Sequence, residues 1–244
     1  MSALLSLPDS INYTRRGHTA IVTLNRPDKR NALDSTSVDA LLHIVEGAAL
    51  DETHLLVLRG NGRSFCAGFD FSGFEDSSEG DLLLRFVRIE QLLQALHHAP
   101  YHTLALTHGP CFGAGADLVC ACAVRVAAPG TTFRMPGLQF GLVLGTRRLT
   151  LRVGVDRARE LLHQSLIFDA ERGFAMGFLT GISPESEWEA LVTQTELASA
   201  LLDAPSTQAL HLLTLPDTRA QDLSELTASA ARPGLIERIR RFRS

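Results

Sequence analysis

Residues 108–117, HGPCFGAGAD, place a glycine-rich turn between an apolar run and a short apolar helix. The preceding residues 103–107 predict a buried strand, and residues 116–122 favour a helix. Small residues at such a junction let a ligand approach the backbone. The first N–H groups of a helix lack partners and carry partial positive charge, which suits a developing anion. A turn that needs glycine only for its backbone angles is the structural alternative.

A second junction of the same kind is SFCAGFD at residues 64–70, after a short apolar strand at residues 55–58. Around the two junctions the chain alternates strands and helices. Residues 11–15 and 19–24 predict a hairpin, and Asp34 or Ser35 can cap a helix. This alternation predicts an α/β sheet layered with helices.

Residues 81–98 predict a further helix, with these residues facing the core: Leu84, Val87, Leu92, Leu93 and Leu96. From Pro184 onward the pattern is purely helical, broken at Pro205, Pro216 and Pro233. We therefore expect an α/β core over residues 1–183 and a C-terminal helical region over residues 184–244.

Composition and charge exclude several classes of protein. The 244 residues are 45% hydrophobic and 20% charged, with a net charge of -4, so the basic face of a nucleic-acid binder is not expected. No run approaches the ~18 apolar residues of a membrane span. The first ten residues lack the pattern of a secretory signal, and we expect a cytoplasmic protein.

The four cysteines and the paired histidines give no metal-ligand spacing. Cys120 and Cys122 are separated by one residue within an apolar run, which suits neither zinc nor a disulfide. His97 and His98 are adjacent and point in different directions on a helix. We expect buried, inert thiols and no metal.

A third segment, LNRPDKRNAL at residues 24–33, joins the two junctions in an order that resembles the crotonase superfamily (enoyl-CoA hydratase/isomerase family). The resemblance extends to GTRRL at 145–149, FDA at 168–170 and GFL at 177–179. It implies a crotonase-like (ClpP/crotonase) α/β spiral of ββα units, with a C-terminal helical region that assembles homotrimers or hexamers. The substrate implied is an acyl-CoA thioester, with no cofactor beyond coenzyme A itself.

The resemblance also implies site residues. The family polarises the thioester carbonyl with two backbone N–H groups, and the matching positions are Ala67 and Ala114. The coenzyme would lie along Lys29, Arg30 and Ala32 and along the loop that holds Cys66 and Asp70. For Lys29 and Arg30, simple solvation is the alternative, and for Asp70 a role in fixing its loop.

Only one of the two acids that family hydratases use has a counterpart. Asp117 matches the first, whereas Gly137 stands at the second, and no Asp or Glu occurs from residue 118 to residue 155. Hydration needs one group to activate water and another to deliver a proton. Asp117 could instead only complement the helix dipole, which is worth ~0.3–1 kcal/mol.

One acid favours a double-bond isomerase with Asp117 as its single base, or an atypical hydratase. The alternatives are a catalytically silent acyl-CoA-binding homologue, a CoA-thioester decarboxylase or hydrolase, and a carbon–carbon hydrolase of a diketone. His108 and Cys111 are further candidate proton carriers, and Arg134 could hold a substrate carboxylate.

Overall fold

Two sheets form the scaffold of the computed structural model, which describes residues 7–244. The six-stranded sheet has the order β1-β2-β3-β4-β6-β9, and the three-stranded sheet has the order β5-β7-β8. The strands are β1 Ile11–Arg16, β2 Thr19–Leu24, β3 Leu55–Gly60, β4 His102–Thr107, β5 Pro110–Phe112, β6 Val124–Ala127, β7 Thr132–Arg134, β8 Phe168–Asp169 and β9 Gly181–Ile182. The α/β class is confirmed.

The predicted hairpin is the antiparallel pair β1 and β2, in which Ile11 lies opposite Leu24. From β2 onward, each neighbouring pair in the large sheet is parallel. Parallel strands are usually covered on both faces and therefore read as continuous apolar runs. In β3, Leu56 and Leu58 face the main core, whereas Leu55 and Val57 pack in a second cluster with Trp188.

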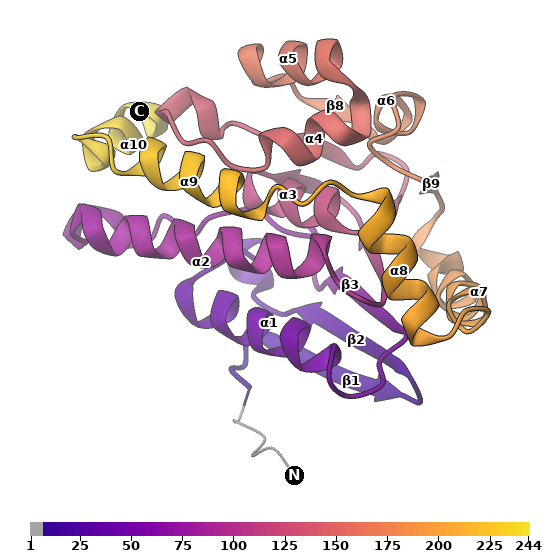
Figure 1. Ribbon diagram of the computed structural model, residues 1–244. Coiled ribbons are helices and arrows are strands. Elements are labelled where there is room, and N and C mark those ends of the chain that lie inside the picture. The colour runs from indigo at the N-terminus through magenta and orange to yellow at the C-terminus, as the bar shows by residue number, and fades with distance from the viewer. Residues whose placement is uncertain (1–6) are drawn as a thin grey trace.

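The helices cover the sheet in layers. They are α1 Ser35–Ala48, α2 Glu79–His97, α3 Ala114–Ala121, α4 Thr146–Val153, α5 Val155–Gln164, α6 Ala170–Ala175, α7 Trp188–Ser199, α8 Ala204–Thr214, α9 Arg219–Ala230 and α10 Leu235–Arg243. Figure 1 shows α2 running between α1 and α9, with α3 behind it. The side chain of Asp34 caps α1 by accepting a hydrogen bond from the Ser37 N–H, as one of the two predicted caps.

Helix α2 confirms most of its expected core face. Leu92, Leu93 and Leu96 are buried, but Leu84 is 58% exposed, so its expected core position was wrong. The reason is helical geometry: the buried face runs through Leu82, Phe86, Ile89, Leu93 and Leu96. Leu84 lies about 200° around the helix from Leu82 and faces away.

The C-terminal region is helical, as expected. Pro205 lies in the first turn of α8, where proline is tolerated, while Pro216 and Pro233 lie between helices. Helix α9 packs along α2, and α10 packs against the turn at Gly137–Phe140. Among residues 7–244, no helix is long and apolar enough to cross a membrane.

Candidate active site

The glycine-rich junction at residues 108–117 starts helix α3, as the sequence predicts, although α3 begins two residues early, at Ala114. Gly113 precedes it with φ 53 and ψ −129, a backbone conformation that favours glycine. The Gly113 N–H donates to the Arg134 carbonyl at 2.8 Å and the Asp117 N–H to the Gly113 carbonyl at 3.0 Å. In the described part of the chain, the Ala114 N–H has no acceptor and remains available to a ligand.

The second junction approaches the same point but exposes a different N–H group from the one expected. The Ala67 N–H donates to the Arg30 carbonyl at 2.9 Å and is therefore occupied, which corrects the assignment of Ala67 as an oxyanion donor. The Asp70 N–H is also occupied, because it donates to the Leu33 carbonyl at 3.0 Å. Between them, the Phe69 N–H has no acceptor among the described residues.

Gly68 lets the two junctions meet. Its φ is +91, and a Cβ at this position would lie 3.2 Å from the Ala114 backbone nitrogen. A side chain here would collide with the carbonyl of Phe112 as well. Phe69 and Ala114 both line one cavity of about 170 Å³.

Asp117 lines this cavity from the first turn of α3 and is only 3% exposed. Burial raises the pKa of Asp117 to about 8; the charge of Arg148 lowers it and that of Glu90 raises it. Its Oδ1 atom has no hydrogen-bond partner. Among the described residues, Asp117 is the only acidic side chain on the cavity wall.

Gly145 makes room for the Asp117 carboxyl. It precedes α4 with φ +66, and a Cβ there would clash directly with Asp117 Oδ1. The GTRRL segment therefore has a specific role beside the acid, because its glycine supplies both the left-handed backbone and the missing volume.

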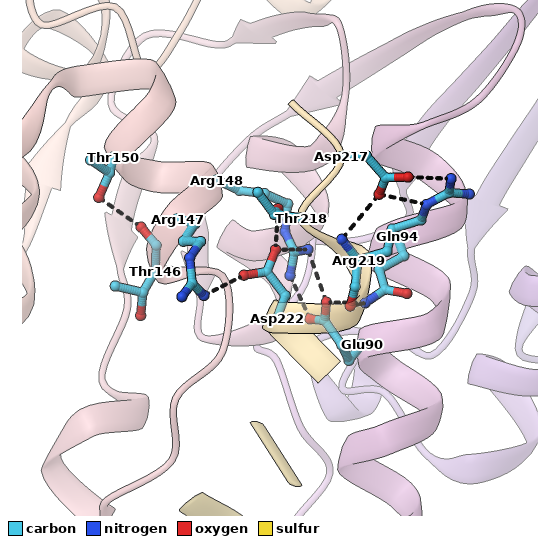
Figure 2. A network of polar contacts seen from close by, with 10 residues as sticks. All are labelled: Glu90, Gln94, Thr146, Arg147, Arg148, Thr150, Asp217, Thr218, Arg219 and Asp222. Atoms are coloured by element: carbon cyan, nitrogen blue, oxygen red, sulfur yellow. Dashed lines mark hydrogen bonds and ion pairs between the residues drawn. The ribbon is translucent and has the colours of Figure 1, made fainter. Parts of the chain in front are cut away.

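A buried ion pair between Arg148 and Glu90 lies close enough to Asp117 for its charges to affect the pKa of that carboxyl. Arg148 donates from Nη1 to Glu90 Oε1 at 3.0 Å and from Nη2 to Glu90 Oε2, and both side chains are at most 2% exposed. Gln94 donates to Glu90 as well, and Asp222 of α9 lies 3.6 Å from Arg148. Figure 2 shows how these residues of α2, α4 and α9 converge. The sequence reasoning missed this cluster, although a charged residue on the apolar face of α2 signals a buried partner.

Gly137 stands where family hydratases have their second acid. It lines the cavity at the start of the turn Gly137–Phe140, and a Cβ there would lie 3.0 Å from the Leu142 carbonyl oxygen. Arg134 also lines the cavity, but its Nε donates to Ser165 and its Nη2 to Gln139. The hypothesis that Arg134 holds a substrate carboxylate therefore rests on Nη1 and on the second N–H of Nη2.

His108 and Cys111 lie outside the cavity. His108 Nε2 is 2.9 Å from the Gly62 carbonyl oxygen, and its ring packs 5.9 Å from Trp188 on the far side of the sheet. Cys111 is fully buried next to Cys66. The four cysteines are free and buried, as expected, and burial raises the pKa of Cys66 to about 12.

The residues expected to contact the coenzyme divide into two groups. Lys29 and Arg30 are exposed and Ala32 is half-buried, so all three can be reached from solvent. Cys66 is fully buried, which corrects its assignment as a contact. Asp70 fixes its loop: it pairs with Arg26 at 2.9 Å and accepts from the Ser72 N–H at 2.9 Å.

No group of three or more potential metal ligands occurs within residues 7–244.

Comparison with known proteins gives a consistent result. A family profile for enoyl-CoA hydratase/isomerase matches residues 14–238. A Mycobacterium tuberculosis protein named as a probable enoyl-CoA hydratase is 32% identical over 183 residues, 74% of this chain and 73% of the relative. A Rhodobacter capsulatus protein with the same description is 33% identical over 188 residues, covering 74% of this chain and 71% of that protein.

A solved structure from Bordetella parapertussis, assigned to the enoyl-CoA hydratase/isomerase class, superimposes with a TM-score of 0.96. It is 45% identical, and the match covers 97% of this chain and 99% of that one. A Bacillus halodurans enoyl-CoA hydratase structure, 19% identical, has a TM-score of 0.83 over 95% of this chain and 99% of its own, and shares the fold.

Proposed function

Because the chain belongs to the enoyl-CoA hydratase/isomerase family of the crotonase superfamily, we propose that it is a double-bond isomerase of acyl-CoA thioesters. The thioester oxygen would accept hydrogen bonds from the N–H groups of Phe69 and Ala114, and Asp117 would carry the proton. Such donors typically contribute ~3–4 kcal/mol each to transition-state stabilisation.

One observation carries the proposal. Asp117 is the sole acidic side chain that lines the cavity among the described residues, and it lies one helical turn after the free N–H of Ala114. A single carboxyl beside an oxyanion site can remove and return one proton. Hydration with two acids needs a second carboxyl, and Gly137 supplies none. The presence of one acid instead of two favours isomerisation.

The reaction balances with one base. The Asp117 carboxylate removes a proton from C2 of a 3-enoyl thioester, and the electron pair moves onto the thioester oxygen to give a dienolate. When the carbonyl re-forms, the C2–C3 double bond forms, the C3–C4 double bond opens, and the Asp117 carboxyl returns the proton to C4. No co-reactant is needed.

The coenzyme would be held near the segment that contains Lys29, Arg30 and Ala32. The exposed cations of Lys29 and Arg30 suit phosphate groups. The Arg30 carbonyl is tied to the Ala67 N–H, so this segment lies directly beside the loop that leads to Phe69. Coenzyme A, as part of the substrate, is the only cofactor that this mechanism requires.

The C-terminal helices would assemble the chain into a homotrimer, or a hexamer made of two trimers. Large leucines on and between α7 and α8 are exposed, among them Leu197 at 69%, Leu201 at 82% and Leu213 at 83%. Exposed large apolar side chains are typical of protein–protein contacts where they form one patch.

Proton exchange tests the proposed function. In heavy water, the protein should exchange the C2 protons of a 3-enoyl-CoA and release the 2-enoyl isomer, and Asp117→Asn should slow both by about 10²–10⁴-fold. Asp156→Asn is the matched control, because Asp156 is an exposed acid in the first turn of α5. Exchange by the Asp117→Asn variant at the normal rate would exclude Asp117 as the base.

A further inference from the structure

Phenylalanine is the most frequent residue in the cavity wall. Of the chain's 12 phenylalanines, six line this one cavity: Phe69, Phe71, Phe86, Phe112, Phe140 and Phe242. They come from elements far apart in the sequence, including the loop after β3, helix α2 and helix α10. Six rings from separate elements indicate a wall with a distinct chemical character.

Five of these rings form a connected cluster with defined geometry. Phe69 stacks on Phe86 with ring centroids 4.4 Å apart and meets the edge of Phe71 at 4.9 Å. Phe140 and Phe242 lie 5.1 Å apart, and Phe140 also packs near Phe71 at 6.2 Å. The sixth, Phe112, is half-buried and pairs with none of these five, so its ring is free to contact a ligand.

The size of the cavity limits its occupant. Its volume of about 170 Å³ is close to the ~150 Å³ of an apolar cavity that admits benzene. One six-membered ring with a short link to the thioester is of a size that such a space accepts. Among the described residues, Asp117 and Arg134 are the only charged side chains on the wall, and the rest of the lining is apolar.

The wall also distinguishes a ring from an alkyl chain. Both would gain from the removal of apolar surface from water. A flat ring can in addition adopt the offset or edge-to-face geometry that aromatic pairs prefer, at centroid separations of ~4.5–7 Å. The rings of the wall already lie at such separations from one another.

We propose that the acyl group of the substrate carries a single aromatic ring, which binds among Phe112, Phe140 and the other phenyl rings of the cavity. This inference rests on the proposed function, because it takes the ligand to be an acyl-CoA thioester. It adds the class of acyl group and names the side chains that select it.

Two thioesters with equal carbon number test the proposal. Phenylacetyl-CoA and octanoyl-CoA both have eight acyl carbons, neither has a double bond to isomerise, and coenzyme A alone provides the reference. By calorimetric titration of the full chain, phenylacetyl-CoA should bind at least about tenfold more tightly than octanoyl-CoA.

Two variants test whether the phenyl rings of the cavity wall cause the preference for phenylacetyl-CoA over octanoyl-CoA. Phe112→Leu should reduce the ratio of phenylacetyl-CoA to octanoyl-CoA affinity at least about threefold. Phe168→Leu is the matched control, because Phe168 is buried in a separate cluster with Phe133 and Phe178 and should leave the ratio unchanged. Thermal melts of both variants confirm that they are folded.

The outcomes separate this inference from the proposed function. If octanoyl-CoA binds as tightly as phenylacetyl-CoA, and both bind more tightly than coenzyme A, the ring preference is wrong while the acyl-CoA function stands. If neither thioester binds more tightly than coenzyme A, the acyl-CoA function itself fails. An unchanged ratio in Phe112→Leu would remove Phe112 from the selecting wall.

Discussion

Asp117 is a carboxyl whose protonation is set by its surroundings. Burial raises its pKa to about 8, so Asp117 is mostly protonated at neutral pH. A base must be ionised in the free enzyme, and kcat/KM reports the pKa of that form. We predict that kcat/KM for a 3-enoyl-CoA rises with pH up to about 8 and then levels off. Initial rates between pH 6 and pH 9 measure this, and a flat profile would contradict it.

The same carboxyl makes stability depend on pH. Since its folded pKa is raised, the native state holds a proton that the unfolded chain releases above about pH 4. This contribution therefore weakens stability progressively from about pH 4 to about pH 8 and is constant above that. Asp117→Asn should gain stability over wild type as pH rises through this window, by an amount on the order of a few kcal/mol. Urea unfolding at pH 5 and at pH 8.5 checks the sign.

Gly145 provides a test of how closely the acid is confined. Gly145→Ala should reduce turnover at least about 100-fold, because the added Cβ clashes with Asp117 Oδ1 and displaces the carboxyl. Gly154→Ala is the matched control: Gly154 lies at the other end of α4, also with positive φ, but a Cβ there meets nothing within 4 Å. Both variants should lose about 1–3 kcal/mol from backbone strain, yet only Gly145→Ala should lose activity.

At the scale of elements, the sequence predicts where the site forms but not which N–H group is free. The glycine-rich junctions are visible as strand-to-helix turns, and Ala114 is indeed the first residue of α3. The choice between Ala67 and Phe69 depends on hydrogen bonds to Arg30 and Leu33, more than thirty residues away. No local pattern encodes such long-range pairing, so the expectation missed the free donor by two residues.

The shortest strands were also not predictable from a local sequence pattern. β1 to β4 have six residues each, and their positions follow from the sequence within about two residues. β8 and β9 have two residues each, and tertiary contacts alone define them. The buried position of Glu90 was not predicted for a related reason. Its ion-pair partner, Arg148, lies on another helix, 58 residues later in the sequence.

Arg148 and Arg147 are neighbours on α4 with opposite environments, which makes them a matched pair. Arg148→Met should destabilise the fold by about 3–5 kcal/mol, because it leaves the buried charge of Glu90 without its partner. Arg147 is 43% exposed, and its partner Asp222, although 11% exposed, also has Thr218 and Arg148 as partners, so Arg147→Met should cost about 1 kcal/mol or less. Chemical denaturation measures both.

The double variant Glu90→Gln with Arg148→Met distinguishes an unpaired charge from lost packing. Removal of both charges should recover a substantial part of the stability lost in Arg148→Met. If the double variant is no more stable than Arg148→Met, the ion pair is not what holds α2 to α4. Equal losses in Arg147→Met and Arg148→Met would also exclude the buried pair as the cause.

At the scale of the whole molecule, the helical region takes part in the site. Asp222 of α9 lies beside Arg148, and Phe242 of α10 closes part of the cavity wall. Figure 1 shows α9 lying along α2, and α10 packs against the turn Gly137–Phe140. Residues 184–244 therefore contribute to the buried ion-pair cluster and to the cavity wall, in addition to the assembly role proposed for them.

The proposed assembly through α7 and α8 can be tested by placing a charge among their exposed leucines. In a trimer held by α7 and α8, Leu213→Glu would place a charge in an apolar contact, and the assembly should dissociate to monomers. Leu50→Glu is the control, since Leu50 is 88% exposed in the turn after α1 and should leave the mass unchanged. Light scattering after gel filtration gives the mass of each. A wild-type mass near the 26.5 kDa of one chain would contradict the trimer directly. A trimer that survives Leu213→Glu but not Leu50→Glu would move the interface away from α8.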